Sequence, residues 1–252
     1  MDNDLTLALE LADLADALTL EHFRSDRLVV ETKPDLTPVS EADRAVEALL
    51  RKRIGEERPD HGVVGEEFGT EGGRHARWIL DPIDGTKNYI RGIPVFATLI
   101  ALQRNGVGAL GVCSAPALGR RWWAVRGQGA FADGRPIRVS GVHDLGDAQL
   151  CHSSLDLWEA YGLGDRFLGL ARRCWRTRGF GDFWMHCLVA EGAADVAVEP
   201  EVSLWDLAAL QVIVEEAGGR LTDLGGAARP DGGSVVTSNG LLHDEVVAAL
   251  RR

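Results

Sequence analysis

The sequence predicts an α+β fold in which helices lie over β-sheet. Apolar side chains recur at helical spacing in residues 4–24 and again in a segment that begins at Ser40. Between Val95 and Val139, short apolar stretches alternate with glycine-containing turns, which is typical of an antiparallel meander. After about Asp144, strand-like and helix-like segments alternate, so helices are expected to cover a sheet there as well.

The first two expected helices are supported by local signals. The first is expected to pack on a core through one apolar face, made by Leu7, Leu11, Leu14 and Leu18. The second is expected to start at Ser40, because Ser40 and Asp43 form an S-x-x-D capping pair. A stiff polar loop, Lys33–Pro38, is expected to join them.

The remaining elements follow from apolar runs and the residues that bound them. Two short buried strands are expected to end directly at acidic residues, at 62–65 and 78–80. Later in the chain we expect a strand near 149–152 and helices near 158–173, 182–191 and 204–217. The chain has no Pro/Ser-rich linker, so residues 1–143 and 144–252 are expected to form two tightly packed subdomains of one functional unit.

Composition excludes several classes of protein. With 27 Lys and Arg against 38 Asp and Glu, the net charge of −11 argues against a general nucleic-acid binder. The longest nearly apolar run, residues 93–102, is far too short to span a membrane. Four cysteines lack C-x-x-C or metal-knuckle spacing, which indicates free thiols in a reducing compartment. A cytoplasmic location is therefore expected.

The densest chemical signal is the segment from Trp78 to Tyr89. Asp81 and Asp84 leave a strand and enter a turn, where Gly85 permits a tight backbone path. Thr86 then begins a short helix, so the free amides of Gly85 and Thr86 suit a phosphate group. The alternative is that both aspartates only cap a turn and a helix.

Further acids stand at similar strand ends and helix starts, namely Asp43, Glu66, Glu67 and Asp206. Each also has a structural interpretation, as a capping-box partner, a solvated charge or a first-turn acid. Four acidic sites without a matching His or Cys cluster favour a hard cation, Mg²⁺ or Mn²⁺, over zinc. The seven histidines lack metal-ligand spacing and are expected to be surface or packing residues.

These motifs, in this order, resemble the inositol monophosphatase family of Mg²⁺-dependent, lithium-sensitive phosphatases nearly end to end. The matching pieces are 33–43, 65–67, 78–86, 205–209 and 215–219. The resemblance implies a layered αβαβα sandwich of the inositol monophosphatase and fructose-bisphosphatase type, and a homodimer.

The resemblance also implies roles for single residues. Two or three Mg²⁺ ions would be coordinated by Glu66, Asp81, the carbonyl of Ile83, Asp84 and Asp206. The Gly85 and Thr86 amides would hold phosphate, and the Thr86 hydroxyl with Glu66 would orient the attacking water. Asp43 would hydrogen-bond Thr86 or help to hold the third ion.

One stretch departs from the commonest family pattern. Arg178-Gly-Phe-Gly-Asp182 resembles the histidinol-phosphate phosphatase branch of the family, and Glu199 matches the position that contacts the leaving group. Histidinol carries an ammonium and an imidazole, which paired acids suit. Arg178, Asp182 and Glu199 are thus the expected substrate-binding residues, although Asp182 could instead only cap the next helix.

The expected reaction is hydrolysis of a small-molecule phosphate monoester by metal-activated water, without a phosphoenzyme. One rival class uses a D-x-D-G-T motif and forms an aspartyl phosphate, but the spacing from Asp81 to Asp84 differs from it by one residue. A second rival is a non-catalytic metal-binding scaffold. Within the family, inositol phosphate, fructose bisphosphate and adenosine bisphosphate remain alternative substrates.

Overall fold

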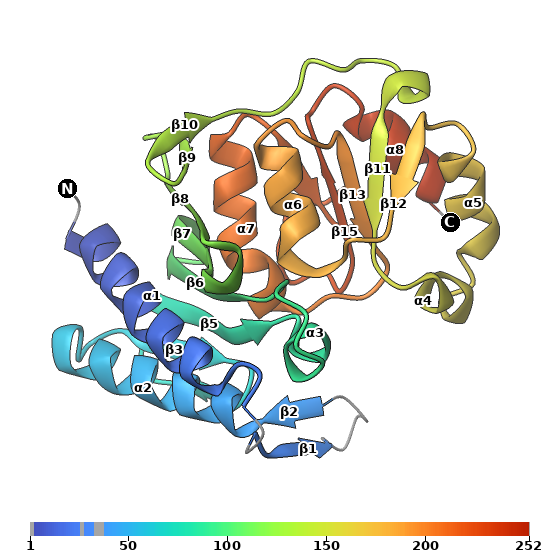
Figure 1. Cartoon of the computed structure of the whole chain (residues 1–252). Helices are drawn as coiled ribbons and strands as arrows, with labels where there is room; N and C mark the ends of the chain where they lie inside the picture. Colours follow the sequence, from blue (N-terminus) through green and yellow to red (C-terminus); the bar gives the residue numbers. More distant parts are fainter. Residues whose placement is uncertain (1–2, 26–27, 33–37, 252) are drawn as a thin grey trace.

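A computed structural model describes residues 3–25, 28–32 and 38–251 of the chain. Its elements are stacked in five layers, in which two sheets alternate with three layers of helices (Figure 1). The expected loop Lys33–Pro38 lies, except for Pro38, outside the described residues.

The larger sheet lies next to the N-terminal helices. Its strands are β3 (Gly62–Gly65), β4 (Gly69–Glu71), β5 (Ala76–Asp84), β6 (Ala97–Arg104), β7 (Val107–Ala115), β8 (Arg120–Val125), β9 (Ala130–Ala132) and β10 (Arg135–Ile137). They lie in the order β10-β9-β8-β7-β6-β5-β3-β4. β3 and β5 run parallel and the other neighbours antiparallel, so the expected meander after Val95 is confirmed.

The smaller sheet is built from the C-terminal half. Its strands are β11 (Gln149–His152), β12 (Arg176–Arg178), β13 (Val196–Glu199), β14 (Arg220–Thr222) and β15 (Val235–Ser238), in the order β12-β11-β13-β15-β14. β11 runs parallel to both of its neighbours, and the pairs that include β15 are antiparallel. A separate hairpin pairs β1 (Val30–Thr32) with β2 (Pro38–Ser40).

The helices form the other three layers. One outer layer has α1 (Asn3–His22) and α2 (Glu41–Glu57), and the other has α4 (Leu155–Ala160), α5 (Gly164–Ala171) and α8 (His243–Leu250). The middle layer has α6 (Asp182–Ala190) and α7 (Leu204–Glu216). Short helical turns are α3 (Thr86–Ile90), η1 (Pro116–Leu118) and η2 (Leu145–Asp147).

Separate apolar clusters join neighbouring layers. α1 and α2 pack on the larger sheet through residues that include Leu11, Leu50 and Trp78. The other face of that sheet packs on α6 and α7, where Trp122 contacts Phe183 and the Cys113 and Cys187 sulfur atoms are 3.8 Å apart. The smaller sheet packs on the same two helices and on the far outer layer. The layered αβαβα sandwich is thereby confirmed.

Two sequence expectations need correction. The single helix expected near 158–173 is two helices, because Gly162 adopts φ 68°, a left-handed conformation that ends α4. The first helix ends at His22 rather than at residue 24, and Arg24 has φ 60°. The starts expected at Ser40, Asp182 and Leu204 agree with α2, α6 and α7.

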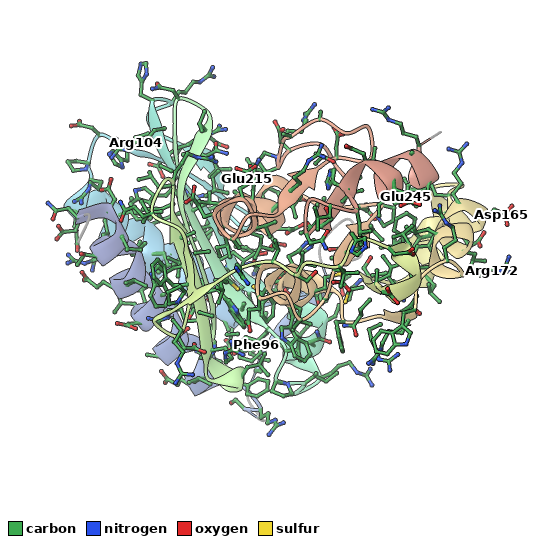
Figure 2. The ribbon with its side chains drawn as sticks, turned by 90° about the horizontal axis from the view of Figure 1, so that it is seen from above. Phe96, Arg104, Asp165, Arg172, Glu215 and Glu245 are labelled. Atoms are coloured by element: carbon green, nitrogen blue, oxygen red, sulfur yellow. The ribbon has the colours of Figure 1, made fainter. Side chains whose placement is uncertain are left out.

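Charged side chains project from the outside of the molecule. In the view from above, Arg104, Asp165 and Arg172 project from the periphery, and all three are exposed (Figure 2). Across residues 3–25, 28–32 and 38–251, none of the helices is both long enough and apolar enough to cross a bilayer.

Candidate active site

A cavity of about 260 Å³ opens where the end of β5 meets the first turns of α6 and α7. Its lining is strongly acidic and brings together Glu66, Asp81, Asp84, Asp182, Glu199, Glu201 and Asp206. Lys87 is the one lysine or arginine among the described lining residues. So many carboxylates in one cavity repel one another unless cations or protons offset their charge.

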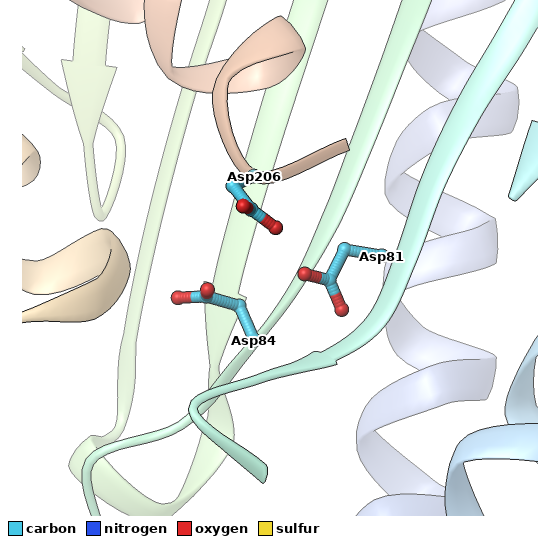
Figure 3. A group of neighbouring side chains, drawn as sticks. All are labelled: Asp81, Asp84 and Asp206. Atoms are coloured by element: carbon cyan, nitrogen blue, oxygen red, sulfur yellow. The ribbon is translucent and has the colours of Figure 1, made fainter. Parts of the chain in front are cut away.

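Asp81, Asp84 and Asp206 form the centre of the acidic lining (Figure 3). Each can offer one carboxylate oxygen, and these oxygens lie within 4.8 Å of one another. Burial, and then the neighbouring negative charges, raise the pKa of Asp81 and of Asp84 well above the usual range. Burial likewise raises the pKa of Asp206 to about 7.

This centre fits a hard divalent cation. Asp81 Oδ1 is buried, and the described part of the chain offers it no hydrogen-bond partner. A buried carboxylate oxygen without a donor is costly. A cation with a preference for oxygen would satisfy it and remove the repulsion between the three aspartates.

Local backbone geometry explains how β5 places both Asp81 and Asp84 in the cavity. The pairing of β5 with β6 loses its register between Asp81 and Asp84, so the chain bulges there. Gly85 follows with φ 83°, and a Cβ at this position would lie 3.0 Å from the Val95 carbonyl oxygen. A side chain is therefore excluded at Gly85, and α3 starts directly afterwards at Thr86.

Thr86 is tied to the N-terminus of α2. Its hydroxyl lies 3.2 Å from Asp43 Oδ1 and 2.9 Å from the Ile83 carbonyl oxygen. The other oxygen of Asp43 accepts from the Ser40 amide and hydroxyl at 2.8 and 2.6 Å, so the expected capping box is present. Asp43 thus caps a helix and contacts Thr86 at the same time, and the two interpretations of this residue are compatible.

The loop of Glu66 is held from α2 by a residue that sequence reasoning missed. Glu47, fully buried, accepts from the backbone amides of Glu67 and Phe68 at 2.7 and 3.1 Å. Arg51 donates to the same carboxylate at 2.7 Å and balances its charge. A Cβ on Gly65 would lie only 2.0 Å from Glu47 Oε1, so a glycine is required before Glu66.

Asp206 enters the cavity from the first turn of α7. Its Oδ2 accepts from the Ser203 amide at 2.7 Å, as part of a second capping box. One oxygen of this carboxylate lies within 4.8 Å of one oxygen each from Asp81 and Asp84 of β5 (Figure 3).

The first turn of α6 brings Asp182 to the same cavity. Asp182 has the left-handed φ of 50°, and its Oδ2 accepts from the Asn88 side chain at 3.0 Å. Burial and the charge of Glu199 raise the pKa of Asp182 to about 6. Burial raises the pKa of Glu199, at the end of β13, to about 8. A bound cationic group would lower both values.

Comparisons with known proteins agree with this arrangement. The sequence profile of the inositol monophosphatase family matches residues 1–252. The chain is 59% identical over 256 residues to a Mycobacterium tuberculosis protein named histidinol-phosphatase, with 98% of each chain covered. It is 52% identical over 259 residues to a Streptomyces coelicolor protein of the same name, with 99% of this chain and 97% of the relative covered.

Among solved structures, an IMPase of Thermotoga maritima superposes with a TM-score of 0.88 at 34% identity. The superposition covers 99% of this chain and 97% of the Thermotoga chain. The chain belongs to the inositol monophosphatase family. It is accordingly an enzyme, a phosphoric monoester hydrolase, and the non-catalytic scaffold is not supported. The family is generally metal-dependent, as the acidic centre would require.

Most of the residues expected from the family motifs lie in or beside this cavity. Glu66, Asp81, Ile83, Asp84, Gly85, Thr86, Asp182, Glu199 and Asp206 line it, and Asp43 contacts it through Thr86. Arg178 is not among the described lining residues; it is exposed on β12 and donates to the Thr177 carbonyl.

Several lining residues were not expected from the sequence. His186, which was assigned to surface or packing, lines the cavity with a side chain only 1% exposed. Lys87 and Glu201 also line it, and Asn88 reaches it through Asp182. Lys87 and Asn88 directly follow Thr86, which is the signal that could have identified them. His186 lies four residues, about one helical turn, after Asp182, and that spacing was the corresponding signal.

Proposed function

We propose that the chain is a Mg²⁺-dependent histidinol phosphatase, which hydrolyses histidinol phosphate to histidinol and inorganic phosphate. The observation that favours this substrate is that Asp182 and Glu199 line the same cavity as the cluster of three aspartates. The relatives named histidinol-phosphatase, which match over nearly their whole length, support it.

Magnesium would be held by Asp81, Asp84 and Asp206, with Glu66 and the Ile83 carbonyl completing the set of oxygen ligands. All of these residues line the cavity, and two or three Mg²⁺ ions, or Mn²⁺ in their place, suit such donors. When bound, the ions would supply positive charge that lowers the pKa of water and stabilises phosphoryl and leaving-group oxygens.

Thr86 and Glu66 would orient the attacking water. A hydroxyl has a single proton, and Thr86 Oγ1 has two acceptors within reach, Asp43 Oδ1 and the Ile83 carbonyl oxygen. While that proton is donated, the oxygen of Thr86 remains free to accept one from water. Asp43 would therefore set the direction of the Thr86 lone pairs.

The Gly85 and Thr86 amides would bind the phosphoryl oxygens. Both residues line the cavity at the start of α3, and Lys87 beside them is a compact positive charge. Water would add to phosphorus on the side opposite the ester oxygen and lose one proton, the ester bond would break, and the departing alkoxide would take up one proton in exchange, so that the step is balanced. We assign Asp206 to the side of the phosphoryl group from which the alkoxide departs.

Asp182 and Glu199 would receive the histidinol part. Its ammonium and imidazole can donate to carboxylates, and charge-assisted bonds of this kind are stronger than neutral ones. A neutral polyol such as inositol would leave both buried acids without a counter-charge, which opposes the inositol-phosphate alternative.

The test is a panel of phosphate esters assayed with Mg²⁺, comprising histidinol phosphate, inositol 1-phosphate, fructose 1,6-bisphosphate and adenosine 3′,5′-bisphosphate. The proposal requires the highest kcat/KM for histidinol phosphate, no turnover after chelation, and inhibition by lithium. A higher kcat/KM for any other ester would contradict the proposed substrate without contradicting the reaction class.

The proposal includes a cytoplasmic homodimer, as the family resemblance and the thiol content suggest. Light scattering of the purified protein, at several concentrations and with and without Mg²⁺, tests the dimer. A monomer at micromolar concentration would contradict that part alone.

A further inference from the structure

His186 has a defined partner on each of its ring nitrogens. Nδ1 lies 2.8 Å from the Thr237 hydroxyl on β15, and Nε2 lies 3.2 Å from Glu199 Oε1 on β13. The imidazole is 1% exposed and Thr237 is fully buried. The three side chains therefore form a chain of contacts that starts inside the smaller sheet and ends in the cavity wall.

The direction of these hydrogen bonds follows from the chemistry of the groups. Burial raises the pKa of Glu199 to about 8, and a bound cationic group would lower it and ionise the carboxyl. In that substrate-bound state the carboxylate only accepts, so Nε2 must be the nitrogen that donates to Glu199. A neutral imidazole has one N–H, which leaves Nδ1 as an acceptor and requires Thr237 to donate. Burial lowers the pKa of His186 to about 4, so the ring is neutral at pH 7.

The opposite tautomer would place the lone pair of Nε2 against a carboxylate oxygen. That arrangement is repulsive, and it would also remove the donor from a buried acid. A hydroxyl can donate or accept, so the ionised Glu199 sets the tautomer, and the Thr237 hydroxyl satisfies Nδ1 in that tautomer and holds the ring in place. A valine at position 237 would fill almost the same volume and leave the buried Nδ1 lone pair without a donor.

We propose that His186 and Thr237 are positioning residues that fix the Glu199 carboxylate for the cationic part of the substrate, and so determine which leaving groups the enzyme accepts. This inference rests on the proposed function, because it assumes that the leaving group carries an amine. It adds two residues, neither of which is expected to touch the phosphoryl group or the metal ligands.

The smaller sheet contains a matched control. His243 is fully buried, and its ring nitrogens lie 2.9 Å from the Thr222 hydroxyl and 2.8 Å from the Ser238 hydroxyl. Ser238 follows Thr237 on β15, so the two side chains point to opposite faces of the sheet. Thr222→Val therefore removes a hydroxyl from a buried histidine that does not line the cavity.

The experiment measures inhibition constants of the two reaction products separately, with Mg²⁺ present. Histidinol reports on the leaving-group part of the cavity, and inorganic phosphate reports on the metal and phosphate part. We expect Thr237→Val to weaken histidinol binding about 10-fold, as loss of an outer hydrogen-bond partner does, and to change phosphate binding less than about 2-fold. Thr237→Ser should restore histidinol binding, and Thr222→Val should leave both constants unchanged.

A second pair of variants applies if Thr237→Val does not fold. His186→Gln keeps an N–H near the position of Nε2, whereas His186→Leu has none, so only His186→Leu should weaken histidinol binding. Unchanged histidinol binding in Thr237→Val or His186→Leu, or an equal loss for histidinol and phosphate, would overturn the inference. Failure of the wild type to bind histidinol or to hydrolyse its phosphate would instead overturn the proposed function.

Discussion

Asp84 Oδ2 lies 2.6 Å from the backbone nitrogen of Phe183, which is 99 positions later in the chain. The carboxylate at the end of β5 thereby accepts from the first turn of α6, next to Asp182. One hydrogen bond thus joins the cluster of three aspartates to the helix turn that carries Asp182, the expected amine-binding residue.

Replacing Asp84 by asparagine should distinguish the effect of its negative charge from the effect of its hydrogen bond with the Phe183 amide. The amide oxygen of the new side chain can still accept from Phe183, but the substitution removes one negative ligand from the cluster. We expect turnover to fall by more than about 100-fold, since changes beyond the ligands themselves already cost about 10- to 100-fold. Phosphate release, with Mn²⁺ binding followed by electron paramagnetic resonance, measures both effects.

The same variant should be more stable than the wild type when metal is absent. Burial, and then the neighbouring negative charges, raise the pKa of Asp84, and the asparagine removes both the buried charge and the repulsion. Thermal unfolding in the presence of a chelator is the control for correct folding. Unchanged turnover of the preferred substrate would contradict the assignment of Asp84 as a ligand.

Neutral substitutions of Asp182 and Glu199 should change substrate preference rather than chemistry. We expect Asp182→Asn and Glu199→Gln each to lower kcat/KM for histidinol phosphate about 10- to 100-fold, the value of a charge-assisted hydrogen bond. Turnover of p-nitrophenyl phosphate should change less than about 3-fold, because the metal ligands remain. An equal loss on both substrates would mean that the acids do not recognise the amine.

Glu47 should control the position of Glu66. In Glu47→Gln one of the two acceptors for the amides of Glu67 and Phe68 becomes a donor, so the loop loses part of its support. We expect about 10-fold weaker Mn²⁺ binding together with lower activity. Glu10→Gln, which breaks an exposed ion pair with Arg53 on the outer face of α2, is the matched control. Reduced thermal stability with unaltered metal affinity would limit Glu47 to a structural role.

Acid should remove the contribution that the neutral ring of His243 makes to stability. Burial, and secondarily the charge of Arg220, lower the pKa of His243 to about 4, whereas the unfolded chain titrates near 6.5. Between these values the unfolded state binds the extra proton, so the stability contributed by the neutral ring is complete above about pH 6.5 and is lost as the pH falls toward 4.

Urea unfolding at pH 5, 6 and 7 measures this dependence. Glutamine at position 243 does not titrate, so we expect His243→Gln to lower stability at pH 7 and to reduce the slope of stability against pH. A slope identical to that of the wild type would show that other groups, such as His186, account for the acid sensitivity.

Direct attack by water predicts inversion of configuration at phosphorus, while an aspartyl-phosphate route predicts retention. A chiral phosphate ester with isotopically labelled oxygens distinguishes them. We expect inversion, and no phosphorylated Asp81 peptide in acid-quenched samples. Retention together with such a peptide would favour the covalent route.

Local signals in the sequence predicted the parts of the site that depend on consecutive residues. The turn from Asp81 to Thr86 and the capping pair of Ser40 and Asp43 are determined within a few positions, so motif and spacing were sufficient. The layer order was obtained only from the family resemblance, because the packing of separate elements leaves no local pattern.

The residues that escaped prediction act across long separations. Glu47 contacts a loop 20 residues away, and His186 bonds Thr237, which lies 51 positions later. A buried glutamate in the middle of α2 looks like any polar residue on a surface helix until its partners are known. The break at Gly162 was missed because a single glycine can be tolerated inside a helix.

The facing thiols of Cys113 and Cys187 can report how often the larger sheet and α6 separate by local opening. Both are fully buried where the larger sheet meets α6, so a thiol-specific reagent can modify them only when these layers separate. Cys174 is partly exposed and should react faster than either buried thiol. Cys151 on β11 is buried as well, so the labelled peptides must be resolved by mass spectrometry. The slow labelling of Cys113 and Cys187 would then report the free energy needed to separate the larger sheet from α6, without any engineered probe.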